Sequence, residues 1–352
     1  MSYRYKVHEM MYSIIKPSKV NLVQAIQCIG ISTMAVLVMM TGLAAAGPKP
    51  TSCAATITSC GCTVTQTGIF TVVNDLDASQ GLTKGGNCLE ISADHVILDL
   101  VGHAIIGNGT GTGILILSSA ANTTVQGTDA TEAGQAIINS WGVGLEDDAN
   151  NVVIELFRQI GGNLRNPTGN AGDGVLLKNA SSVTVGNFNA SFNGGAGVDI
   201  QGGSGNRLFN FTVTNNTTAG VVVASSNVNT LLNCTIANNP GYGVWFNSAN
   251  QNQIITGGVN ANGKIGVLLG CAKEGKCKGN KGSDLNHISS FGANGNSGAG
   301  ITVEEGSSNN QITNVKSGGN GGTSDLIDDN PSCDGNLWFN NAFGSASQSC
   351  IH

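Results

Sequence analysis

The chain has 352 residues, of which 51 are Gly, 6 are Pro and 11% are charged, with 16 Lys and Arg against 22 Asp and Glu. So few charges exclude a charged disordered polymer, and the scarcity of helix-forming residues argues against a helical fold. Recurrent Gly, Asn, Ser, Thr and Val indicate short strands separated by tight turns. The net charge of −6 argues against nucleic acid as a partner.

Residues 1–46 have the pattern of a secretory signal peptide. Four basic residues precede an uncharged stretch, 20–46, that ends in three alanines. The alternative is a retained membrane anchor, because 27 uncharged residues can span a bilayer. Cleavage would leave 12 basic and 21 acidic residues, a net charge of −9. We therefore expect a secreted, periplasmic or cell-surface protein that has no membrane contact after signal cleavage.

Residues 47–87 are predicted to form an N-terminal cap. Cys53, Cys60 and Cys62 lie in this region and Cys88 follows it. Export permits disulfides, but the pairing among these four cysteines cannot be deduced from their spacing. Zinc bound at Cys60 and Cys62 is the alternative, which no histidine spacing supports.

Residues 88–322 contain a repeat in which a glycine opens each short apolar strand. Five such glycines follow one another at intervals of 23 residues, namely Gly174, Gly197, Gly220, Gly243 and Gly266. Gly113, Gly142 and Gly300 open similar strands, at longer intervals that we interpret as one repeat plus a loop. The first and third residues after each glycine from 174 onward are apolar in every repeat, which predicts one buried and one outward face.

Asparagines recur at two fixed places in this repeat. Nine residues after the glycine stand Asn122, Asn151, Asn206, Asn229, Asn252 and Asn309, and nineteen after it stand Asn193, Asn216, Asn239 and Asn262. Asparagine suits turns and can both donate and accept hydrogen bonds, so stacked coils would align it at two corners. The pattern predicts an all-β, right-handed parallel β-helix solenoid of about nine three-stranded coils. A leucine-rich repeat would need a helical or leucine-rich second half, which the sequence lacks.

Residues 323–352 are predicted to form a C-terminal cap that contains Cys333 and Cys350. Cys271 and Cys277 are expected to close a loop between two coils. The remaining cysteine, Cys234, falls at the same inward position of its coil as Phe211. We therefore predict disulfide-rich caps and one buried free thiol.

The segment 91–107, followed by coils that carry Gly-Val and Asn-Asn pairs, resembles the first turns of secreted right-handed parallel β-helix repeat proteins of the pectin-lyase-like superfamily. The resemblance covers about residues 60–345. It implies the fold but no single activity, because the superfamily includes polysaccharide lyases, glycoside hydrolases, uronate epimerases, phage tailspikes and members without known activity.

Catalytic signatures of that superfamily are missing or broken in this chain. The lyase pattern Arg-x-Pro-x-x-Arg is incomplete at Arg165, because Asn170 replaces the second arginine. The polygalacturonase set is not assembled, and the Asp-Pro-His motif of alginate epimerases is absent. No catalytic residue can be carried over, and whether the protein is an enzyme stays open.

The outward face of the glycine-opened strands is the first candidate site. Its second positions are predicted to form a column of Gly144, Leu176, Asp199, Val222, Trp245, Leu268 and Thr302. Trp245 could stack on a sugar ring, and Asp199 could bind its hydroxyls or a Ca²⁺ ion. Lys178, at a fourth position, and Asp199 are the candidate catalytic residues. Alternatively, Trp245 covers its apolar neighbours and Lys178 forms a surface ion pair.

Two insertions are expected to flank this face. Residues 163–173 carry Arg165, and residues 271–281 carry a basic group made of Lys273, Lys276, Lys278 and Lys281. These lysines could bind a glycan or simply be solvated. The acidic runs 146–148 and 325–334 are further candidates for Ca²⁺, without a ligand spacing typical of calcium sites.

Three functions follow from these observations. The first is a glycan-binding or surface-associated rod without catalysis, whose partner is a polysaccharide or surface glycan. The second is a polysaccharide lyase or related enzyme, in which Lys178 removes a proton and Ca²⁺ on Asp199 neutralises a uronate. The third is a purely structural envelope protein.

Overall fold

A computed structural model describes residues 51–79, 82, 85–128, 136–271, 277 and 282–352. All of them belong to one compact unit that spans residues 50–352. The expected signal peptide, residues 1–46, lies outside the described residues. Within the described ranges, no helix is long and apolar enough to cross a membrane.

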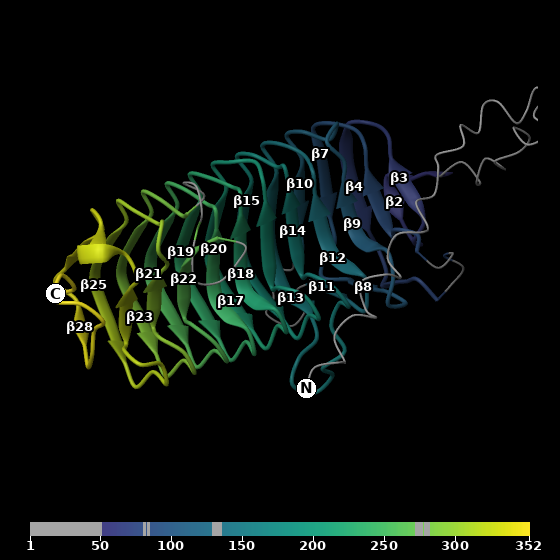
Figure 1. The fold of residues 1–352 in the computed structure, drawn as a ribbon. Helices are drawn as coiled ribbons and strands as arrows, with labels where there is room; N and C mark the ends of the chain where they lie inside the picture. Colours follow the sequence, from purple (N-terminus) through teal and green to yellow (C-terminus); the bar gives the residue numbers. More distant parts are fainter. Residues whose placement is uncertain (1–50, 80–81, 83–84, 129–135, 272–276, 278–281) are drawn as a thin grey trace, which may run out of the picture. The chain divides into compact units, whose positions relative to one another are not determined.

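The glycine-opened strands form one parallel sheet of 12 strands, here called the first sheet. Figure 1 shows its strands side by side along the solenoid. In order the strands are β1 (Thr51–Ser52), β3 (Cys62–Val64), β6 (Leu89–Ile91), β9 (Thr112–Ile116), β12 (Val143–Asp147), β14 (Val175–Lys178), β16 (Val198–Gln201), β18 (Ala219–Ala224), β20 (Tyr242–Asn247), β22 (Val267–Gly270), β24 (Ile301–Val303) and β26 (Leu326–Asp328). The sheet has three strands more than the nine predicted coils, because β1, β3 and β26 in the expected cap regions continue it.

The remaining strands form a second parallel sheet of 16 strands. Its main path contains β2 (Thr56–Ile57), β4 (Gly68–Val72), β7 (Val96–Asp99), β10 (Thr124–Gln126), β13 (Val153–Gly161), β15 (Thr184–Ser191), β17 (Arg207–Thr214), β19 (Thr230–Ala237), β21 (Gln253–Asn260), β23 (His287–Asn294), β25 (Gln311–Gly318) and β27 (Leu337–Phe339). Beside this path lie β5 (Leu76–Asp77), β8 (Ala104–Ile106), β11 (Ala136–Asn139) and β28 (Ala342–Phe343).

The long strands of the second sheet bend in the middle, so that each supplies two of the three strands predicted for a coil. Asn187, Asn210 and Asn233 lie at this bend with φ angles of 53°, 51° and 52°. Asparagine tolerates this left-handed backbone better than most residues. We call the half of each long strand after the bend the third strand of its coil.

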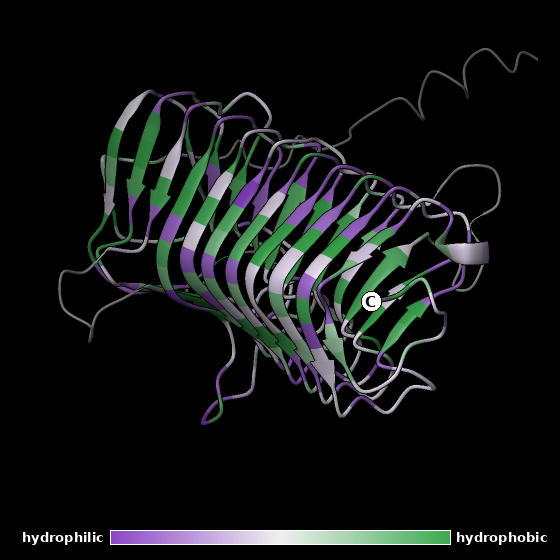
Figure 2. Cartoon of the chain, turned by 90° about the vertical axis from the view of Figure 1, so that its left-hand side faces the viewer, coloured by the Kyte–Doolittle hydropathy of each residue, from purple (hydrophilic) through white to green (hydrophobic). Residues whose placement is uncertain are grey.

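Apolar side chains on alternate residues fill the inside of the coils. Val175, Leu177, Val198 and Ile200 are fully buried, as their spacing predicted. Phe211 and Cys234 pair in register and are both buried, which confirms their common inward position. Figure 2 shows the resulting apolar bands that pass from strand to strand.

The strand register corrects one predicted coil. Leu145 pairs with Val175, and Asp147 pairs with Leu177. The glycine that corresponds to Gly174 is therefore Gly144 and not Gly142. Because of this two-residue shift, Asp147 occupies an inward position between Ile116 and Leu177 and is completely buried.

Two ladders of buried asparagines connect the coils at their corners. In the first, the side-chain amide of each residue donates to the next at 2.9 to 3.1 Å along Asn170, Asn193, Asn216, Asn239, Asn262, Asn296 and Asn320. In the second, the distances are 2.8 to 3.2 Å along Asn229, Asn252, Asn286, Asn310 and Asn336. The last amides donate to Asp325 and Asp328.

The column predicted nineteen residues after the glycine is thus confirmed, and the column predicted nine residues after it is partly corrected. Asn206 donates its backbone N–H to Asn229, so it begins the second ladder. Asn122, Asn151 and Asn309 do not belong to it: they occupy the preceding turn position with φ near +56°. The reason is that loops of different length separate the strands in those coils, so a count from the glycine is displaced.

Four disulfides lie in the described residues. Cys53 pairs with Cys62, Cys60 with Cys88, Cys271 with Cys277, and Cys333 with Cys350. Cys234 is the free cysteine, and burial raises the pKa of its thiol to about 12. It therefore acts as a small apolar core residue, as predicted.

Candidate functional site

The pairing of neighbouring strands shows which residues form the outward column of the first sheet. From Leu176 through Asp199, Val222, Trp245, Leu268 and Thr302, each residue pairs with the next, as the spacing predicted. On the other side of Leu176 the structure places Glu146, where Gly144 was expected. The corrected column therefore contains two carboxylates, one on each side of Leu176.

Trp245 belongs to an aromatic and apolar cluster on this outward face. Its ring centroid lies 5.5 Å from that of Tyr242, and the Lys264 ammonium lies 4.7 Å from the Tyr242 ring centroid. Val222 and Leu268 beside it are 8% and 1% exposed. Trp245 is itself partly exposed, so it both covers these neighbours and presents ring surface outward.

Asp199 is the most perturbed carboxyl group of the face. Burial raises its pKa to about 6, the hydrogen bond from Gln201 opposes the shift, and the nearby Asp173 adds to it. Gln201 Nε2 donates to Asp199 Oδ2 at 2.7 Å, whereas the buried Oδ1 has no partner among the described residues. Burial also raises the pKa of Asp173, whose Oδ1 accepts the Ala196 N–H at 2.7 Å.

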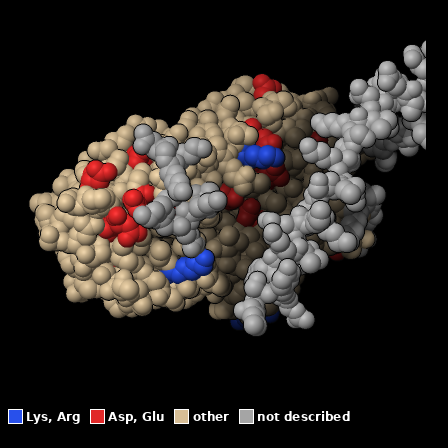
Figure 3. Space-filling view, viewed as in Figure 1, with Lys and Arg blue, Asp and Glu red and all other residues tan. Residues whose placement is uncertain are grey.

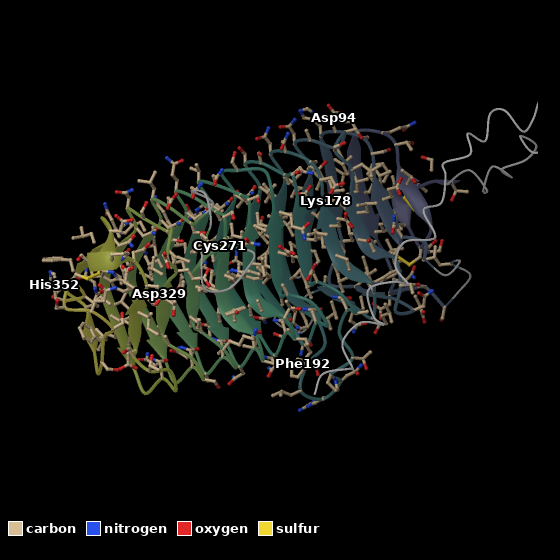
Figure 4. The ribbon with its side chains drawn as sticks, in the orientation of Figure 1. Asp94, Lys178, Phe192, Cys271, Asp329 and His352 are labelled. Carbon is tan, nitrogen blue, oxygen red and sulfur yellow. A yellow bond between two sulfur atoms is a disulfide. The ribbon has the colours of Figure 1, made fainter. Side chains whose placement is uncertain are left out.

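Lys178 forms a surface ion pair. Its Nζ lies 3.5 Å from Glu146 Oε1, and half of the lysine side chain is exposed. Figure 3 shows acidic groups (red) around a basic group (blue) over the part of the first sheet where Figure 4 labels Lys178.

The basic loop expected beside this face can be placed only in part. Lys273, Lys276, Lys278 and Lys281 lie outside the described residues. The disulfide that closes the loop lies against the buried Glu304, whose Oε2 accepts the Cys271 N–H at 3.2 Å.

Three carboxylates of the acidic runs considered for Ca²⁺ accept hydrogen bonds within the protein, namely those of Asp147, Asp325 and Asp328. Asp147 points into the core, and its Oδ1 accepts the Ala149 N–H. Asp325 accepts hydrogen bonds from Asn320, Gly344 and Ser345. Asp328 likewise accepts hydrogen bonds at both carboxylate oxygens. The side chains of Asp325 and Asp328 are therefore held by hydrogen bonds within the C-terminal coil.

Of the described residues, three have potential ligand atoms within 4.8 Å of one another: Cys271, Cys277 and Glu304. The two cysteines of this group are joined in a disulfide. Their sulfurs are therefore not available as thiolate ligands in this state.

A groove of about 990 Å³ lies elsewhere, against the third strands of β13, β15 and β17. Arg158 and Arg165 both line it. The part of the insertion that carries Arg165, residues 163–166, therefore lies against the third strands and not beside the first sheet as expected, whereas its end at residues 171–173 bonds to the start of β12. Arg158 was missed, since it lies within a strand whose irregular register is invisible in the sequence.

Residues 165–317 match the model of the family described as right handed beta helix region. The Dettilon tailspike protein is 16% identical, with 81% of this chain and 60% of the tailspike covered and a TM-score of 0.52. The A-module of a mannuronan C-5 epimerase from Azotobacter vinelandii is 11% identical, with 81% and 85% covered and a TM-score of 0.49. No curated protein matches the sequence. The chain therefore has the fold of a right-handed parallel β-helix.

Proposed function

We propose that this protein binds glycans through the outward face of the first sheet. The observation that carries the proposal is the tilted pair of Tyr242 and Trp245 rings on that face. Aromatic rings present an apolar surface on which the C–H face of a sugar can stack. Asp199 and Gln201, two coils away, offer hydrogen-bonding groups about 10 Å from the rings. A short oligosaccharide lying along the coils could contact both.

Export fits this role. Four disulfides in a chain of 352 residues are typical of proteins that fold outside the reducing cytosol. We therefore infer a secreted, periplasmic or cell-surface location. Lys273, Lys276, Lys278 and Lys281 lie outside the described residues, and their part in binding stays a prediction.

A carbohydrate-active enzyme is the second candidate, and Asp199 is the observation that favours it. A carboxyl group with a pKa near 6, beside a second carboxyl group, is suited to proton transfer. Asp199 is a better candidate for this step than Lys178, because the lysine is paired with Glu146. Release of new reducing ends from a polysaccharide by the unchanged protein would support this alternative over binding alone.

Binding to a panel of immobilised neutral and acidic polysaccharides tests the proposal. We expect Trp245→Ala to weaken binding to the preferred polymer at least tenfold, since the stacking surface is lost. Phe339→Ala is the matched control, because it removes a 58% exposed ring far along the sequence in β27. Equal binding by the Trp245 variant and the unchanged protein, at equal thermal stability, would refute the proposal.

A further inference from the structure

We propose that the groove against the third strands is a second binding site, whose ligand is a linear glycan bearing carboxylate or sulfate groups. Its lining residues come mainly from the turn at residues 163–166 and from the third strands of β13, β15 and β17. None of them belongs to the first sheet. Figure 4 labels Lys178 over the first sheet and Phe192 at another edge of the coils. The groove is therefore separate from the aromatic face.

A β-bulge in β13 builds one wall of the groove. Phe157 pairs with Phe188 and Ile160 pairs with Ala190, so two residues, Arg158 and Gln159, stand where the neighbouring strand has only Asn189. Bulges redirect side chains and recur beside functional sites. Asn189 Nδ2 donates to the Arg158 carbonyl at 2.8 Å and holds the bulge.

A tight turn after β13 builds the opposite wall. Asn163 Oδ1 accepts the N–H groups of Arg165 and Asn166 at 2.9 and 3.0 Å, and the Asn163 N–H donates to the Asn166 carbonyl at 2.7 Å. This asparagine turn keeps Arg165 beside the groove. Leu164 at the tip of this turn is 88% exposed. Its side chain therefore contributes nothing to the packing of the coil.

Charge indicates the class of ligand. The lining contains two arginines and no Asp or Glu, whereas the chain as a whole has a net charge of −6. Within the described part of the chain, neither guanidinium has a carboxylate within 4.0 Å. Both arginines are exposed. Arginine binds carboxylate and sulfate through paired N–H donors. An anionic ligand would therefore accept hydrogen bonds from both guanidinium groups.

The other lining groups fit a sugar chain better than a nucleic acid. Asn189 and Thr212 pair in register on successive coils, and Ser191 and Thr214 hydroxyls lie 3.0 Å apart. Amides and hydroxyls at coil spacing can bond to successive sugar hydroxyls. Sites for single-stranded nucleic acid combine a basic groove with several aromatic rings on which bases stack, whereas this lining has Phe192 as its one aromatic residue.

Polygalacturonate and its fully methyl-esterified form are suitable probes, because they differ only in carboxylate charge. We expect the Arg158→Gln, Arg165→Gln double variant to bind polygalacturonate at least tenfold more weakly and with a smaller dependence on salt. The neutral ester should bind the unchanged protein and the double variant equally weakly. Arg165→Gln alone, on the exposed turn, should give a partial loss without affecting folding.

Arg207→Gln is the matched control, since it removes the same charge from an arginine that lies over Phe209 outside the groove. Full binding by this variant and by Trp245→Ala would support a separate arginine site. An equal loss in Arg207→Gln, unchanged binding in the double variant, or binding of the ester as tight as that of polygalacturonate would overturn the proposal. Tighter arginine-dependent binding of single-stranded DNA would overturn the ligand class.

Discussion

At the residue scale, the most unusual group is a carboxyl inside the coil. Asp147 lies between Ile116 and Leu177, and its Oδ2 has no hydrogen-bond partner among the described residues. Burial raises its pKa to about 7, the Ala149 N–H opposes this shift and Asp148 adds to it. Because the unfolded state ionises near pH 3.8, folding is favoured when the group stays protonated.

Asp147→Asn is therefore predicted to stabilise the protein at pH 8. The raised pKa means that stability contributed by the neutral form is lost as the pH rises from about 4 through about 7. The charged form costs at most roughly 4 kcal/mol. Urea unfolding at pH 8 and pH 4 should show a gain for the variant that largely disappears at pH 4. Asp334→Asn, which changes an exposed carboxylate, is the control variant, and a gain for Asp147→Asn that is equal at both pH values would contradict this prediction.

At the element scale, each turn is linked to the next through asparagine side chains. An asparagine amide both donates and accepts, so one residue type can repeat without leaving a buried group unpaired. The ladder must end on a group that only accepts, and Asp325 and Asp328 occupy these ends. The bent strands depend on asparagine for another reason, because Asn187, Asn210 and Asn233 adopt positive φ at the bend of successive coils.

Asn239→Ala is predicted to lower the free energy of unfolding by about 3 kcal/mol. The change removes the bonds to Asn216 and Asn262 and leaves both buried amides incompletely paired. Chemical denaturation measures the loss. Asn233→Gly is the control, because it removes an exposed amide bond to Asn210 while still allowing positive φ. A loss no larger than that of the control would show that the ladder is not a major source of stability.

At the scale of the whole molecule, the ends of the solenoid need protection because their strands lack one neighbour. The 53–62 and 60–88 disulfides lie at one end, and the 333–350 disulfide lies at the other. In a structure where each coil contacts mainly its neighbours, such crosslinks oppose fraying from the termini.

Removal of the last disulfide by Cys333→Ala and Cys350→Ala is predicted to cost about 3 kcal/mol, because the unfolded chain regains the freedom of a loop of 17 residues. Hydrogen exchange should accelerate first in β26 to β28. Cys234→Ala removes a sulfur without removing a crosslink and should leave exchange at this end unchanged. Uniform acceleration along all coils would argue against fraying from the terminus.

Much of this architecture was predictable because its signals are local and repeated. Glycine spacing, alternating apolar residues and the asparagines at 193, 216, 239 and 262 all describe one coil, and stacking identical coils aligns them. The outward column from Leu176 to Thr302 follows for the same reason. The predictions deviated where insertions interrupted the period, at Asn122, Asn151 and Asn309.

The sequence by itself thus determined the parallel β-helix, its repeat and its inward residues, because each depends on neighbours within one period. Only the tertiary structure decided the register across insertions, which places Asp147 inside the coil and Glu146 beside Leu176. It also decided that Arg158 and Arg165 share a groove. The physical reason is that a bulge and a folded-back turn depend on contacts between coils, which no period along the chain records.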